Sequence, residues 1–127
     1  MRIILLAGLV AAVSLSCAPP ATARTSRDSN VITSEELAAS QTTNAYDAVR
    51  RLRPNFLNSR GTTTISGGAS AYARVYLDRV LFGDINSLKN LSVNGIREIH
   101  YYNGPEASGR FGLDNTAGAI EVISASR

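Results

Sequence analysis

The sequence contains no tryptophan, and aromatic residues make up only 6% of its 127 residues. A core built from this chain must therefore consist mainly of Ile, Val, Leu and Ala side chains. There is one cysteine, Cys17, and one histidine, His100. The single cysteine excludes a disulfide inside the folded part. With a single histidine, the sequence shows no group of residues at the spacing of metal ligands or of a nucleophile and its base. We therefore expect no enzymatic activity, no metal and no cofactor.

The sequence also has only a small excess of positive over negative charge. The formal net charge is +3 in a chain with room for one domain. Nucleic-acid binding requires a clustered basic face, which this sequence does not indicate. The glycine-rich stretches do not match the phosphate-loop pattern, because no lysine follows at the required spacing. We therefore expect no nucleic-acid partner.

The sequence has no apolar run long enough to span a membrane as a helix. The longest, residues 3–13, falls short of the ~20 residues that a spanning helix needs. It follows Arg2 and precedes small and polar residues, which is typical of a signal peptide over residues 1–16. Cys17 comes directly after, as the lipidated cysteine does in bacterial lipoproteins. The alternatives are secretion with cleavage after Ala23 and a retained anchor.

The rest of the chain divides into a tether and one domain. Residues 17–30 carry little to bury and predict a disordered tether behind the lipid. Over residues 31–127, Asn44 predicts a cap for a helix at 45–52. Strands are expected at 71–77, 96–102 and 118–124, with a short helix at 106–111. The predicted fold class is α+β, with a small mixed sheet of three to four strands and short helices packed on it.

Two groups of side chains are candidates for a contact surface. Their members are Arg50, Arg51, Arg53, Tyr72, Tyr76 and Tyr101. The arginines could meet lipid head groups or an acidic partner, although cations at the end of a helix also suit its dipole. The tyrosines could form a docking or sugar-stacking face, although tyrosines also favour strands generally.

His100 has two interpretations as well. Strand alternation places it on one face with Ile96, Glu98 and Tyr102. It could bind a metal together with Glu98 or Asp78, or it could be a half-exposed strand residue. The sequence favours the second interpretation, because a third ligand at metal spacing is not visible.

Four blocks in the second half follow one another in a recognisable order. They read VYLDRV at 75–80, IREIHY at 96–101, GPEASGRFG at 104–112 and AGAIEVI at 117–123. This series resembles the plug domain of TonB-dependent outer-membrane receptors. In that family, an Asp-Gly turn, an I-E-R-I-E-V strand, a G-P-x-S-x-x-Y-G stretch and a G-G-V-I-N-I strand occur in the same order. The resemblance implies a plug-like fold and a location in the cell envelope.

The chain also departs from that family. Arg79 stands where the family has glycine, and Ala117 replaces one glycine of the later pair. No residues remain after Arg127 for the receptor β-barrel, and no energy-coupling box is visible near the mature N-terminus. We therefore do not carry over receptor transport.

Three functions remain open from the sequence. The first is a non-enzymatic outer-membrane lipoprotein that contacts another envelope protein. The second is a module that binds a glycan or a siderophore, and the third is an orphan plug fragment of a receptor.

Overall fold

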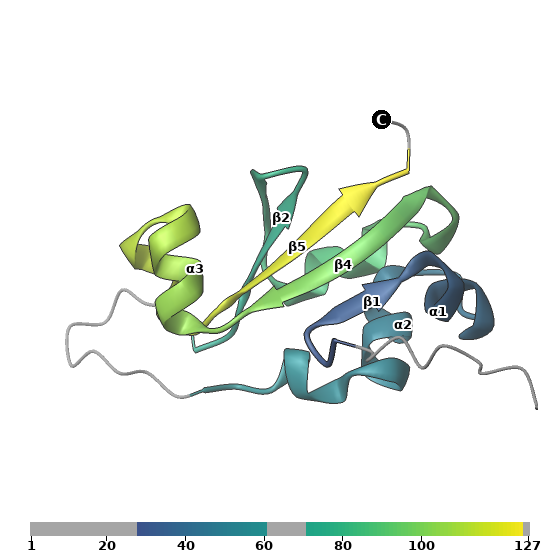
Figure 1. Cartoon of the computed structure of the whole chain (residues 1–127), viewed down its shortest axis with the longest axis horizontal. Coiled ribbons are helices and arrows are strands. Elements are labelled where there is room, and N and C mark those ends of the chain that lie inside the picture. Colours follow the sequence, from purple (N-terminus) through teal and green to yellow (C-terminus); the bar gives the residue numbers. More distant parts are fainter. Residues whose placement is uncertain (1–27, 61–70, 126–127) are drawn as a thin grey trace, which may run out of the picture.

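The computed structural model describes residues 28–60 and 71–125 (Figure 1). The expected signal peptide, Cys17, most of the tether and the glycine-rich stretch 61–70 lie outside the described residues. Within the described part of the chain, no helix is long and apolar enough to cross a membrane.

Five strands form one mixed sheet in the order β1-β4-β5-β2-β3. They are β1 (Val31–Thr33), β2 (Arg74–Leu77), β3 (Val80–Gly83), β4 (Ile96–Tyr102) and β5 (Ala119–Ser124). Only the β2–β5 pair is parallel. The α+β class is confirmed. The two strands missing from the prediction, β1 and β3, are the short edge strands of the sheet.

Three α-helices accompany the sheet: α1 (Ser34–Ala39), α2 (Ala45–Leu52) and α3 (Gly104–Phe111). Asn44 caps α2 as predicted, by accepting a hydrogen bond from the backbone N–H of Asp47. Both α1 and α3 begin with a capping box, formed by Thr33 with Glu36 and by Asn103 with Glu106. The 3₁₀ turns are η1 (Pro54–Leu57), η2 (Ile85–Asn90), η3 (Val93–Gly95) and η4 (Leu113–Asn115).

The two faces of the sheet are covered differently. The main core lies on one face, where α1, α2, η1 and η2 cover the inward side chains of the strands. On the other face a smaller cluster joins Tyr76 and Ala119 of the sheet to Ala107 of α3. In Figure 1, α3 lies at one end of β4 and β5. The rest of this face, next to α3, carries polar side chains such as Glu121 and His100.

Three details differ from the expectations. Residues 28–30 belong to the folded body and not to a tether, because Ser29 O accepts a bond from Arg53 and Asn30 O one from Tyr101 N. Strand β2 begins at Arg74, so Tyr72 precedes it. Ile96 lies in the main core and not beside His100, because the β4–β5 register shifts between residues 96 and 98 and reverses the alternation.

Candidate functional site

The expected tyrosine face does not form, because two of its members are buried. Tyr101 is 5% exposed and stacks on Phe56, with ring centroids 4.8 Å apart. Tyr76 is 6% exposed, stacks on Phe111 at 4.0 Å and donates a hydrogen bond to Asn115 Oδ1. Tyr72 is exposed. We therefore remove Tyr76 and Tyr101 from the contact surface, since neither ring can reach a partner.

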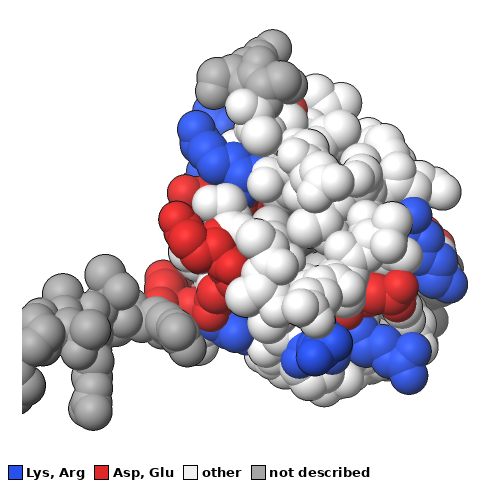
Figure 2. All heavy atoms as spheres, turned by 90° about the vertical axis from the view of Figure 1, so that its right-hand side faces the viewer, with Lys and Arg blue, Asp and Glu red and all other residues white. Residues whose placement is uncertain are grey.

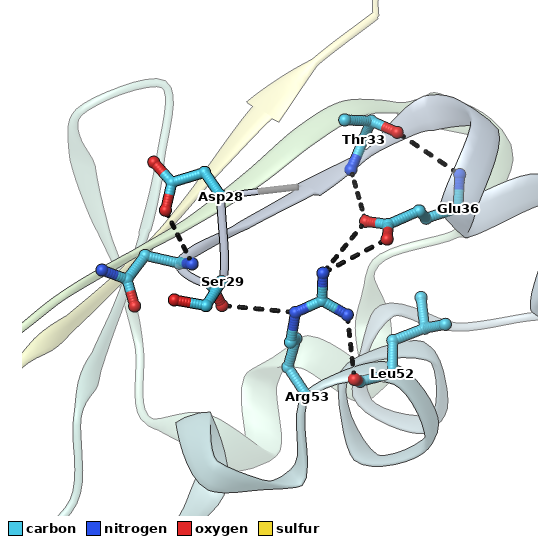
Figure 3. A network of polar contacts seen from close by, with 7 residues as sticks. Asp28, Ser29, Thr33, Glu36, Leu52 and Arg53 are labelled. Atoms are coloured by element: carbon cyan, nitrogen blue, oxygen red, sulfur yellow. Dashed lines mark hydrogen bonds and ion pairs between the residues drawn. The ribbon is translucent and has the colours of Figure 1, made fainter. Parts of the chain in front are cut away.

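The side chain of Arg53 is held in a network of polar contacts inside the domain (Figure 3). Its guanidinium donates to the backbone oxygens of Ser29 and Leu52, at 3.2 and 3.1 Å. It also lies 3.2 and 3.4 Å from the two carboxylate oxygens of Glu36. Arg50 and Arg51 are exposed on α2. Of the three arginines, only these two remain on the surface as contact candidates.

Instead, the polar half of the sheet carries a surface depression of about 370 Å³. Its lining comes from the β2–β3 turn, from β4 and β5, and from α3: Asp78, Arg79, His100, Tyr102, Arg110, Glu121 and Ile123. A second depression of about 320 Å³ is lined by Arg79, Arg110 and Phe111. The two arginines are common to both.

The floor of the larger depression is a small polar network. Glu121 is 3% exposed and accepts a hydrogen bond of 2.9 Å from the Tyr102 hydroxyl. Arg110 Nε lies 3.6 Å from the same carboxylate, and its Cζ lies 4.7 Å from the centroid of the Tyr102 ring. Glu121 is thus a buried carboxylate with a hydroxyl and a cation as partners, as a buried charge requires.

The electrostatics of Tyr102 reflect this arrangement. Burial raises the pKa of Tyr102 above 10.0, and the neighbouring Glu121 carboxylate raises it further. The positive charges of Arg110 and Arg79 oppose this rise in the pKa of Tyr102. The hydroxyl therefore stays protonated at neutral pH and acts as a hydrogen-bond donor.

His100 lies at the side of the depression, with Nε2 2.8 Å from Glu98 Oε2. Asp78 is turned to β5, where its carboxylate accepts bonds from Ser124 N and Oγ at 3.0 and 2.7 Å. Across residues 28–60 and 71–125, no group of three or more His, Cys, Asp or Glu side chains is placed to hold a metal ion.

A second surface feature is strand β3 at the edge of the sheet. Its residues Val80, Leu81 and Phe82 are 70%, 53% and 40% exposed. One side of the strand pairs with β2, and the other side is the end of the sheet. Exposed apolar edge strands invite pairing with another chain, and proteins usually protect them.

The surface charges do not gather into one patch on the face drawn in Figure 2. There, Lys and Arg side chains and Asp and Glu side chains lie around the margin of a largely uncharged centre. A contact on this face would therefore rest on apolar and neutral polar groups.

Sequence reasoning did not bring Arg79, Arg110 and Glu121 together. Two signals were available. The first signal is that side chains alternate between the two faces of a strand, which places Tyr102 and His100 on the face of β4 opposite the core. In addition, Arg79 occupies a turn position that favours glycine. The adjacency of α3 and the β2–β3 turn depends on tertiary structure and left no local signal.

Comparison with known proteins adds no assignment: no family model, no curated protein and no solved structure matches this chain.

Proposed function

We propose that this chain is a non-enzymatic binding module of the cell envelope, which contacts another envelope protein by strand addition at β3. The observation that carries the proposal is the exposure of Val80, Leu81 and Phe82 on an edge strand. In strand addition, backbone hydrogen bonds supply affinity and alternate side chains supply specificity. An envelope location is supported by the signal-like start, Cys17 and the resemblance to receptor plugs.

Because the side chains of β3 are apolar, covering them with a protein partner is more favourable than leaving them exposed to water. Its consecutive apolar side chains alternate between the two faces of the sheet, so the side chains of an added strand could contact them on both faces. Strand β3 itself carries no charged side chain that would oppose unwanted pairing, and its charged neighbours in the sequence are Arg79 and Asp84. The partner we propose is therefore an envelope protein that presents an extended segment with apolar residues.

The test is a photo-crosslinking amino acid placed at Leu81 of the full-length protein in cells. The matched control is Leu113, which is apolar and 85% exposed but lies in a 3₁₀ turn without a free strand edge. We expect one envelope protein to be captured at Leu81 and not at Leu113. Val80→Lys should abolish this capture, because a charged edge opposes pairing.

Equal capture at both positions, a crosslink only between two copies of this chain, or capture that survives Val80→Lys would each contradict the proposal. The location is tested separately by mass spectrometry of the mature N-terminus. Acyl groups on Cys17 are expected. An unmodified N-terminus at Arg24 would instead indicate secretion.

A second candidate function is the binding of a small ligand, such as a glycan or a chelate. The specific observation that favours it is the depression between Arg79, Tyr102 and Arg110. A thermal-shift screen would detect such a ligand, because binding to the native state raises apparent stability.

A further inference from the structure

The β2–β3 turn holds two residues in an unfavourable backbone conformation. Asp78 and Arg79 have φ values of 47° and 72°. This left-handed region is unfavourable for a residue with a Cβ, whereas glycine adopts it freely. Asp78 has a structural reason to be there, because its side chain binds Ser124 on β5. Strain of this kind concentrates at functional sites.

Arg79 has no comparable structural reason. In residues 28–60 and 71–125, no hydrogen bond or ion pair holds its side chain, and the residue is exposed. A glycine at this position would remove the strain. The arginine instead lines both depressions of the polar sheet face, together with Arg110.

Both arginines line the larger depression together with Tyr102. Arg110 is fixed over the Tyr102 ring, and the charge of Arg79 also reaches Tyr102. Glu121 offsets one of these positive charges, but it is buried and already bonded to Tyr102. Asp78, the other carboxylate that lines the depression, is bonded to Ser124 on β5. Both carboxylates are therefore engaged by other groups, and within the described residues the Arg79 guanidinium keeps its N–H donors unused. Arginine presents paired N–H donors that match the two oxygens of a carboxylate or phosphate.

We propose that Arg79 and Arg110 bind the oxyanion of a small ligand that also carries a flat apolar part. Phe111 and Ile123 supply apolar walls beside the two arginines. The volumes of about 370 and 320 Å³ lie at the lower end of the range for small-molecule sites. The inference rests on the second candidate function, because it uses the same depression, and it does not depend on strand addition at β3.

The test is a titration of the full mature protein with benzoate, monitored by NMR. Benzamide is titrated in the same way as the uncharged control. Inorganic phosphate is titrated in parallel. We expect benzoate or phosphate to bind and benzamide not to bind. Arg79→Gly should weaken the binding by at least about tenfold, which corresponds to the loss of one charged hydrogen-bonded pair.

Arg79→Gly is informative because it should not lower the melting temperature, so weaker binding could not be attributed to unfolding. Arg110→Gln should weaken binding as well, and Arg51→Gln on α2 should leave it unchanged. Binding of benzamide as tight as benzoate, unchanged binding in Arg79→Gly, or no binding of either anion would overturn the proposal. Phosphatidylglycerol vesicles are titrated as well, and binding to them alone would also overturn the proposal, because it would indicate a membrane surface. Crosslinking at Leu81 reports on the β3 contact separately.

Discussion

Replacing Arg53 by methionine should destabilise the domain strongly, although the residue looks like one of several surface arginines in the sequence. Its guanidinium joins three segments: Ser29 before β1, Glu36 in α1 and Leu52 at the end of α2. Methionine keeps part of the apolar stem but supplies no donor. The substitution therefore tests the polar contacts more than the packing.

The magnitude follows from the burial of the pair. The side chains of Arg53 and Glu36 are 18% and 16% exposed. A fully exposed pair contributes up to about 1 kcal/mol, and breaking a fully buried pair costs about 3–5 kcal/mol. We therefore expect Arg53→Met to lower the free energy of unfolding by about 2–3 kcal/mol. For a domain of this size, that loss corresponds to a fall of roughly 10–15 °C in the melting temperature.

The assay is urea unfolding of the mature chain, followed by circular dichroism. Arg51→Met is the matched control, because Arg51 is exposed on the same helix, and it should change stability by less than about 0.5 kcal/mol. A double-mutant cycle with Glu36→Gln should give a coupling of about 1–2 kcal/mol between the two side chains. The reasoning is refuted if Arg53→Met and Arg51→Met have the same effect, or if the coupling is zero.

Two further predictions concern α3 and the tyrosines. Gly104→Ala should destabilise the domain by several kcal/mol, because its Cβ would overlap a backbone carbonyl oxygen. Gly109→Ala in the same helix meets open space and should stabilise by about 0.5–1 kcal/mol. Thermal unfolding of both variants checks this, and a milder effect at Gly104 than at Gly109 would contradict it. Burial raises the pKa values of Tyr101 and Tyr102 above 10.0. The protonated hydroxyls therefore contribute stability that is present below pH 10 and lost as pH rises through the raised folded-state values. Ultraviolet titration of tyrosinate should show two rings ionising late, together with alkaline unfolding; simultaneous ionisation of all tyrosines in the folded state would rule this out.

Much of the fold could be predicted from local signals. Asn44 and the apolar stripe of α2 are adjacent in the chain, and so are the alternating residues of β4. Capping and periodicity are therefore readable without tertiary contacts. The same reasoning missed β1 and β3, because strands of three or four residues carry too little periodicity to be separated from loops.

The roles of single side chains were harder to predict. Strand propensity placed Tyr76 and Tyr101 on strands but could not say which face α3 or η1 would cover. Both rings were therefore assigned to a contact surface and are in fact buried. Likewise, Arg50 and Arg53 both lie near the C-terminal end of α2, but only Arg53 meets Glu36 and the segment before β1.

The sequence alone determined the α+β class, the Asn44 cap of α2 and the main strands, because these depend on residues a few positions apart. The resemblance also marked Arg79 as a departure, because the receptor family has glycine at this position, and the structure gives the residue a positive φ. Only the tertiary structure decided that Arg79, Arg110 and Tyr102 surround one depression and that β3 forms an exposed edge. Those features depend on which segments pack together, and a crossover from β2 to β5 brings together residues more than forty positions apart.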